Sequence, residues 1–360
     1  MLKYILNKLF YGFLVLMGVI TLVFFLFNVL PGDPARMIMG QRSDISSLEA
    51  INKDLGRDKP LVVQYLNYLN DLSPLSFHNP TEVKSYWYLD SNKYTSATKL
   101  ISFSDNSVLV FKKPYFRRSY QSKRQVSEIL AEAFPKTALL AFVSIFIAIV
   151  IGIGIGILCA VWKDSWFDKS ALIFATAGMS VPSFFAAIIM AWLFAFVLAP
   201  YTGLNMFGSM YSVDDFGNGE YLDLKNLILP AITLGIRPIA VVVELTRSSM
   251  LDVLSQDYIR TARAKGVPFR GIVLGHALRN AMNPVVTAIS GWLASMLAGA
   301  VFVEYVFDWK GVGVVIVDAL EKYDFPVVMG AVLCISVILI IINIMVDIIY
   351  GWLDPRVRIA

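Results

Sequence analysis

The sequence predicts an all-α integral membrane protein with six transmembrane helices, a helical cytoplasmic loop, and a large extracytoplasmic insertion between the first two helices. Of its 360 residues, 57% are hydrophobic and 16% are charged, whereas soluble domains contain about 45–50% apolar residues. Uncharged runs of about 20 residues, the length of helix that crosses the hydrocarbon core of a bilayer, recur along the chain. Lipid is therefore expected to surround much of the protein.

Five runs without Asp, Glu, Lys or Arg are long enough to span the membrane. They comprise residues 9–30, 137–161, 170–199, 284–303 and 327–346. A sixth apolar run, residues 227–245, is interrupted by Arg237 and contains Glu244 near its end. The first run is longer than the roughly 7–15 residues of a signal-peptide core and no small-x-small cleavage site follows it, so we expect it to remain as a helix.

Lysine and arginine in the short loops predict the orientation of the spans. They are concentrated at the N-terminus, in residues 162–169 and 247–283, and in the C-terminal tail. The opposite short loops, residues 200–225 and 304–325, contain few of them among many acids. We therefore expect both termini to be cytoplasmic. The chain then divides into residues 1–30 with the first span, an extracytoplasmic segment 31–136, spans two to six in 137–353, and a cytoplasmic tail 354–360.

The extracytoplasmic segment is expected to contain small folded elements. A short helix is predicted from Ser46 or Ser47 through Lys53, and residues 61–72 place apolar side chains at helical spacing. Residues 99–112 predict a β-hairpin with its turn at Asp105 and Asn106. Residues 125–134 predict an amphipathic helix that ends at the following proline. The segment is interpreted either as a platform for a partner or as a cover over the outer mouth of the spans.

The cytoplasmic loop, residues 247–283, is too polar for lipid. It predicts one helix, a break at Gly266-Val267-Pro268, and a second helix that ends at Asn283-Pro284. A helix–turn–helix on the inner membrane surface would result. The alternative is that the basic residues of this loop only set the topology and contact anionic lipid headgroups.

Residues 257–266, Asp-Tyr-Ile-Arg-Thr-Ala-Arg-Ala-Lys-Gly, and residues 276–281, His-Ala-Leu-Arg-Asn-Ala, resemble the cytoplasmic coupling loop of ABC importer permeases. The resemblance is to the dipeptide, oligopeptide and nickel branch. Leu-Pro-Gly-Asp-Pro at 30–34, Ser-Val-Pro-Ser-Phe at 180–184 and the stretch 346–356 match the same branch. Three features depart from the family pattern. The sequence has Arg-Thr-Ala at 260–262 where the broader importer consensus has Glu-Ala-Ala, and residues 77–113 form an insertion. The resemblance also does not explain Arg237 inside the fourth span.

The resemblance implies a permease subunit that forms half of a translocation pore in a bacterial inner membrane. It implies a second homologous permease, two ATPase subunits and an extracytoplasmic solute-binding protein as partners. ATP and Mg would be used by the ATPase subunits, so this chain is expected to bind no cofactor or metal and to catalyse no reaction. The expected solute is a dipeptide or oligopeptide, with nickel or another small solute as the alternative.

The resemblance also assigns the contact with the ATPase subunits to a short helix and the turn that follows it. Tyr258 and Ile259 are expected to be apolar anchors, the basic residues to be polar contacts, and Gly266 to permit the turn. The complete set is Gln256, Asp257, Tyr258, Ile259, Arg260, Thr261, Ala262, Arg263, Ala264, Lys265 and Gly266.

Arg237 is the most unusual residue of the predicted spans. A charge near the bilayer centre costs roughly 2.5–3.5 kcal/mol on insertion scales, so Arg237 is expected to face protein or water. It would either face the pore and contact a carboxylate of the solute or pair with an acid of the partner subunit. The glycines at 152, 154 and 156 favour close helix packing, which we expect within one subunit.

Several other classes of protein are disfavoured. An intramembrane enzyme needs acid–base groups at membrane depth, yet the only histidines are His78 and His276 and no span contains paired carboxylates. A secondary carrier is disfavoured because no internal repeat is found. The net charge of +4 is small and scattered, which argues against nucleic-acid binding. Cys159 and Cys334 lie in apolar runs, where they form no disulfide framework.

Overall fold

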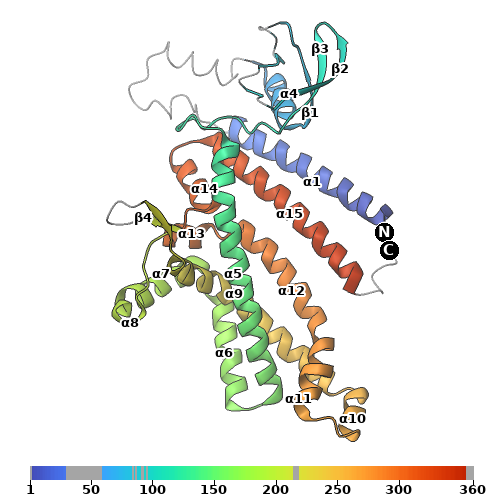
Figure 1. Ribbon diagram of the computed structural model, residues 1–360, viewed down its shortest axis with the longest axis vertical. Helices are drawn as coiled ribbons and strands as arrows, with labels where there is room; N and C mark the ends of the chain where they lie inside the picture. Colours follow the sequence, from blue (N-terminus) through green and yellow to red (C-terminus); the bar gives the residue numbers. More distant parts are fainter. Residues whose placement is uncertain are drawn as a thin grey trace. The chain divides into compact units, whose positions relative to one another are not determined.

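The computed structural model is predominantly helical (Figure 1), and it describes residues 2–29, 59–82, 85, 87–90, 93, 94, 96–213 and 219–353. Its long helices are α1 (Leu2–Val29), α5 (Val126–Val161), α9 (Lys225–Leu254), α12 (Leu278–Gly299) and α15 (Phe325–Leu353). Its shorter helices are α4 (Leu61–Leu72), α6 (Trp166–Ser180), α7 (Ser183–Trp192), α8 (Ala199–Thr202), α10 (Asp257–Ala264), α11 (Phe269–Gly271), α13 (Val301–Phe307) and α14 (Val312–Glu321), with π-helical segments η2 (Leu193–Val197) and η3 (Ile272–Ala277). The helix expected at residues 46–53 lies outside the described residues.

Four helices of the described chain, α1, α5, α9 and α15, are long and apolar enough to cross a membrane alone. Two bent pairs raise the number to six if each pair is one span. One pair joins α6 to α7 and η2 with a bend of 111°, and the other joins the helix ending in α12 to α13 with a bend of 57°. The predicted helical membrane fold is therefore confirmed, with four to six candidate spans.

The predicted span over residues 170–199 is not one straight helix. The helix stops at Ser180 and restarts at Ser183, and Val181 between them is extended with φ −75° and ψ 128°. Pro182 explains the break, because its ring disfavours helical backbone at the preceding residue and it has no N–H to donate. The polypeptide therefore turns sharply within an apolar run.

Two predicted helix ends, at Pro135 and at Pro284, are wrong. Pro135 lies inside α5 and Pro284 lies inside α12, and both helices continue through them. Each proline removes one backbone hydrogen bond, but buried side chains occur on both sides, such as Ala133 and Leu140 in α5. We infer that apolar burial along these helices offsets the missing bond.

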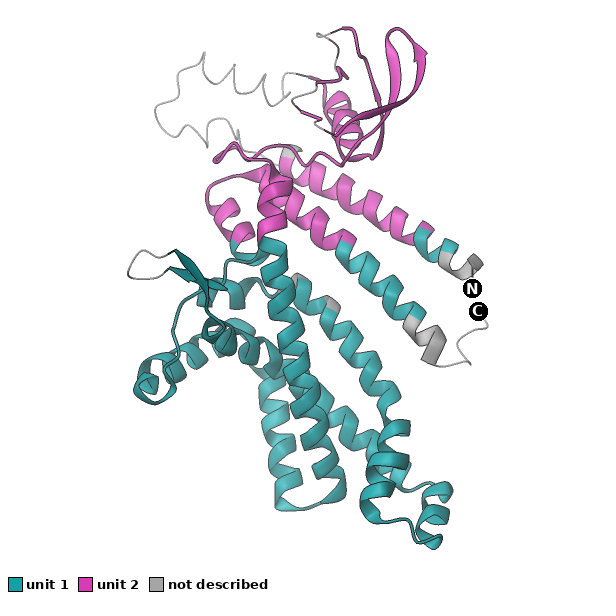
Figure 2. Ribbon diagram, viewed as in Figure 1, with its two compact units in different colours: residues 1–9, 133–314, 338–360 teal, residues 10–132, 315–337 magenta. Residues whose placement is uncertain are grey.

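The described chain forms two compact units, drawn in separate colours in Figure 2. The first unit comprises residues 1–9, 133–314 and 338–360, and the second comprises residues 10–132 and 315–337. The first unit contains most of the apolar helices, together with the hairpin of β4 (Tyr211–Val213) and β5 (Glu220–Leu222).

In the first unit, glycines of α5 bring α9 into close contact. An added Cβ at Gly152 would lie 2.7 Å from the Val242 side chain, and one at Gly156 would lie 2.6 Å from Thr246. Gly154 faces open space, with nothing within 4 Å of an added Cβ. The expected packing within one subunit is confirmed for Gly152 and Gly156, which are four residues apart on one helix face.

A fully buried carboxylate, Glu304 of α13, joins three elements of the same unit. It accepts a hydrogen bond of 2.6 Å from the Thr137 hydroxyl of α5 and one of 2.6 Å from the backbone N–H of Gly313 in α14. An added Cβ at Gly311 would lie 2.5 Å from the same carboxylate, so the chain can approach Glu304 only with glycine there. These donors compensate for the loss of hydration of the buried acid.

The second unit packs α1, α4 and part of α15 around an apolar cluster that includes Phe24, Tyr68 and Leu333. Helix α4 has the bounds predicted from the periodicity of residues 61–72. It is followed by an antiparallel sheet of order β1-β3-β2. The strands are β1 (Leu75–His78), β2 (Thr98–Ser104) and β3 (Ser107–Phe111), and Ser104 pairs with Ser107 across the turn that links β2 to β3.

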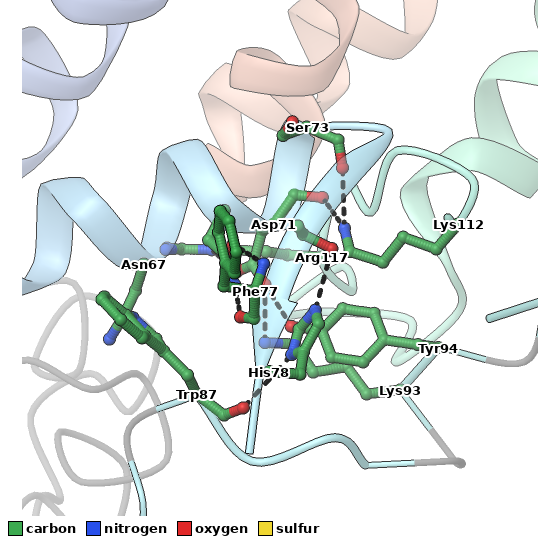
Figure 3. Close-up of polar contacts among 12 residues, drawn as sticks. Asn67, Asp71, Ser73, Phe77, His78, Trp87, Lys93, Tyr94, Lys112 and Arg117 are labelled. Carbon is green, nitrogen blue, oxygen red and sulfur yellow. Dashed lines mark hydrogen bonds and ion pairs between the residues drawn. The ribbon is translucent and has the colours of Figure 1, made fainter. Parts of the chain in front are cut away.

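A polar cluster at Asp71 connects α4 to the chain that follows it (Figure 3). The buried Asp71 carboxylate accepts hydrogen bonds of 2.8 Å from Lys93 Nζ and 2.6 Å from the Tyr94 hydroxyl. The buried Lys112 ammonium donates to the backbone carbonyls of Asp71 at 2.6 Å and of Ser73 at 3.2 Å. Residues separated by about 40 positions are thus held at the C-terminal end of α4.

His78 of β1 is buried beside this cluster. Its ring nitrogens lie 3.0 Å from the Ser76 hydroxyl and 3.2 Å from the carbonyl of Trp87. Burial, followed by the nearby positive charge of Lys112, lowers the pKa of His78 from 6.5 to about 4. The folded protein therefore favours the neutral imidazole.

We predict that Gly156→Ala lowers the melting temperature of the detergent-solubilised protein by several degrees, because overpacking typically costs about 1–3 kcal/mol. The new methyl group would overlap Thr246 and the backbone carbonyl of Val243. Gly154→Ala, whose methyl group meets no neighbour, serves as the matched control and should not lower the melting temperature. Equal melting temperatures for the two variants would contradict the packing of α5 on α9.

We predict that the second unit loses stability as pH falls from about 6.5 towards 4. The unfolded chain protonates His78 near pH 6.5, whereas the folded protein resists protonation until about pH 4. Limited proteolysis within residues 59–132 should accelerate between pH 7 and pH 5, and His78→Gln should reduce this acceleration. The control His276→Gln removes the other histidine, which is exposed, and should retain the wild-type pH dependence. An identical pH dependence in the His78 variant would refute the assignment.

Candidate functional site

The segment expected to contact the ATPase subunits forms a separate short helix. After α9 ends at Leu254, Gln256 adopts extended backbone as the N-cap of α10. Asp257 lies in the first turn and Arg263 in the last turn, where each charge is favourable to the helix dipole. An ion pair of 3.3 Å joins Asp257 to Arg260, but both side chains are exposed, so it contributes little to stability.

The C-terminal end of α10 has the hydrogen bonds of a Schellman motif. The Val267 N–H donates to the Ala262 carbonyl at 3.2 Å, and the Gly266 N–H donates to the Arg263 carbonyl at 3.0 Å. Gly266 has a φ of +76°, the left-handed conformation that other residues adopt at a cost of roughly 1–2 kcal/mol. An added Cβ there would meet no neighbour within 4 Å. Gly266 is thus required by the backbone conformation of the turn.

Nine of the eleven predicted contact residues are exposed. They are Gln256, Asp257, Tyr258, Arg260, Thr261, Arg263, Ala264, Lys265 and Gly266. Ala262 and Ile259 are instead buried, and Ile259 has no exposed surface. Ile259 was predicted to be an apolar anchor for the ATPase subunit, but its side chain is buried within its own chain and is not accessible to a partner. Tyr258 remains 44% exposed and is available to a partner.

The side chains of Ile259 and Ala262 pack α10 against α5, α9 and η3. They belong to an apolar cluster with Met250 of α9, Ala160 of α5 and residues of η3. A force applied to α10 therefore acts on α9 and α5 through packed side chains. Two exposed apolar residues near this cluster, Phe269 and Leu274, are 51% and 60% exposed. The sequence analysis missed them, although Phe269 directly follows the predicted break at Pro268.

An ion pair joins α9 to α6 near the same end of the unit. Arg247 donates from Nε to Asp168 Oδ1 at 2.5 Å and from Nη2 to Oδ2 at 2.7 Å. Asp168 also accepts from the backbone N–H of Asp164 at 2.9 Å. Because Asp168 is 1% exposed, removal of Arg247 would leave a buried charge without its partner. This pair fixes the position of α6, whose other end is the break at Val181.

Arg237 lies on α9 at a cavity of about 140 Å³. The cavity is formed where the break between α6 and α7 meets α9 and α12, and its walls include Val181, Ser183, Thr233, Trp292 and Ser295. Arg237 is exposed in the single chain. The described residues contain no group of three His, Cys, Asp or Glu that could hold a metal ion.

Comparison with known proteins identifies the family. A profile described as "Binding-protein-dependent transport system inner membrane component" matches residues 152–359. A second profile, described as "Binding-prot-dependent transport system membrane comp, N-term", matches residues 1–79. Together they match both ends of the chain and leave residues 80–151 outside the two profiles.

Three curated relatives are similar to nearly the whole chain. The "Probable D,D-dipeptide transport system permease protein DdpB" of Escherichia coli (strain K12) is 35% identical, over 96% of this chain and 94% of the relative. The "Di/tripeptide transport system permease protein DppB" of Pseudomonas aeruginosa (strain UCBPP-PA14) is 33% identical, over 95% and 94%. The "Glutathione transport system permease protein GsiC" of Salmonella choleraesuis (strain SC-B67) is 34% identical, over 99% of both. The chain therefore belongs to the family of binding-protein-dependent transport system inner membrane components, as a permease subunit of an ABC importer.

Proposed function

We propose that this permease imports short peptides and that α10 transmits the movement of an ATPase subunit to the membrane helices. In this family ATP hydrolysis is performed by separate ATPase subunits, and a binding protein delivers the solute. The names of the three relatives, which refer to D,D-dipeptides, di- and tripeptides and glutathione, support a peptide as the solute. This chain itself binds no cofactor, while ATP and Mg bind to the ATPase subunits.

The coupling role is supported by the arrangement of α10. One face of the helix is fastened to α9 and α5 by Ile259 and Ala262. The other face presents Tyr258 and exposed basic residues, which suit a groove on a partner protein. Because one face of α10 is packed against α9 and α5, a movement of a partner bound to its exposed face would be transmitted to those helices. The exposed Phe269 and Leu274 extend the apolar part of this surface.

The proposed complex contains this chain, a second homologous permease, two ATPase subunits and an extracytoplasmic binding protein. Both termini and α10 lie on the cytoplasmic side, and residues 31–136 lie outside, because the short loops rich in Lys and Arg are then cytoplasmic. The first unit supplies one half of the pore and the second permease supplies the other half.

We predict that Gly266→Leu abolishes peptide transport and peptide-stimulated ATP hydrolysis while the protein still inserts into the membrane. Leucine would strain the left-handed turn after α10, although its Cβ would meet no neighbour. Gly266→Asn should retain more activity, since asparagine tolerates this conformation. Gly275→Leu is the control, because Gly275 is exposed, has no positive φ, and an added Cβ there meets no neighbour. Normal stimulated hydrolysis in the Gly266→Leu complex would refute the coupling role.

We predict that a cysteine placed at Lys265 reacts with a membrane-impermeant thiol reagent only in inside-out vesicles. A cysteine at Lys113 should react only in right-side-out vesicles. Both positions are exposed, and both variants are made after Cys159 and Cys334 are replaced by serine. Labelling of Lys265→Cys from the outer face would contradict the proposed orientation.

A further inference from the structure

The middle of α9 exposes two opposite charges on one face. Among residues 229–247, all of which the structure describes, the only exposed residues are Arg237 and Glu244. They are seven positions apart, which is about two turns of helix, so both side chains project from the same side. Every other residue of this stretch is buried or half-buried by the chain itself.

This face cannot be covered by lipid without a large cost. Each charge placed in the hydrocarbon core costs roughly 2.5–3.5 kcal/mol on insertion scales. The described residues form no ion pair with Arg237 or Glu244, and Arg247, three positions beyond Glu244, is already paired with Asp168. The face therefore borders water or a polar partner.

A second helix adds polar groups beside these charges. Helix α12 packs against α9. It exposes a stripe at intervals of three or four residues, which consists of Asn280, Asn283, Thr287, Gly291 and Ser295. Ser295 and Arg237 line the same cavity, together with Trp292. The exposed faces of α9 and α12 thus provide charges and hydrogen-bonding groups, and the half-buried Trp292 adds an indole ring at the cavity.

We propose that Arg237 and Glu244 bind the two ends of a peptide as it passes along this face, Arg237 at the terminal carboxylate and Glu244 at the terminal ammonium. The inference rests on the proposed function, because it requires a peptide as the solute. At neutral pH a free peptide carries a negative carboxylate and a positive amine. The positive Arg237 and the negative Glu244 therefore match a peptide in only one orientation, with its carboxylate at Arg237 and its amine at Glu244.

The spacing of the charges also corresponds to a short peptide. Seven residues of α-helix rise by about 10.5 Å, and an extended chain of three residues is about 10–11 Å long. A tripeptide lying along α9 would place its carboxylate at Arg237 and its amine towards the cytoplasmic end of the helix. Trp292 at the cavity would contact an apolar side chain of the bound peptide.

The test measures uptake of radiolabelled trialanine, trialanine amide and N-acetyl-trialanine by the complete transporter in proteoliposomes. For each permease variant, kcat/KM is divided by the wild-type value obtained with the same binding protein. The terminus preference of the binding protein cancels in this ratio. The ratio then reports only what the permease substitution changes.

Arg237→Gln should lower kcat/KM for trialanine at least about tenfold and change the value for trialanine amide less than about threefold, because hydrogen bonds to charged groups are strong. Glu244→Gln should lower kcat/KM for trialanine by a similar factor and leave N-acetyl-trialanine nearly unchanged. Lys225→Gln is the control. It removes an exposed charge from the outer end of the same helix, and it should lower uptake of all three peptides equally or not at all.

An equal loss for the free and blocked peptides in Arg237→Gln and Glu244→Gln would overturn the inference, because it would indicate structural pairing with the second permease. No change in either variant would overturn it as well. In both cases wild-type uptake of trialanine would still uphold the proposed function. A wild-type complex that accumulates no trialanine with ATP would overturn the proposed function together with this inference.

Discussion

The close packing of α9 against α5, α6 and α12 is the constraint on which the rest of the first unit depends. Gly152 and Gly156 of α5 allow α9 to approach to distances that a methyl group on either glycine would prevent. The buried ion pair of Arg247 with Asp168 holds α6 in place. Because α9 continues almost directly into α10 and also bears Arg237, the same packing positions both the exposed face of α10 and the cavity.

The apolar runs predicted the membrane class and the helices because the length of an uncharged run is a direct measure of what a bilayer can accommodate. Proline was a less reliable guide. Pro182 ends a helix, whereas Pro135 and Pro284 do not, although all three lie in apolar surroundings. The outcome depends on what the flanking residues pack against, which a single sequence does not contain. The paired carboxylate of Asp168 was missed for the same reason.

The position of α10 and of the turn after it could be predicted from the sequence, but which of its side chains are buried could not. Tyr258 and Ile259 are adjacent and both have large apolar side chains, yet Tyr258 is 44% exposed and Ile259 has no exposed surface. The difference arises from the direction in which α10 leaves α9, after the short link at Ser255 and Gln256. Likewise, the exposure of Glu244 beside Arg237 became informative only because every other residue of 229–247 is at least partly buried.

Strand β2 lies at an edge of its sheet, and all seven of its residues are exposed, including Leu100, Ile101 and Phe103. An apolar edge of this kind can recruit strands from other molecules and so promote aggregation. Here the pairing of β2 with β3 is irregular between Lys99 and Ile101 and again between Ser102 and Ser104. Such irregularities twist the outer backbone and spoil the regular ladder that an incoming strand would need. The irregular pairing therefore protects a segment whose composition alone would favour self-association.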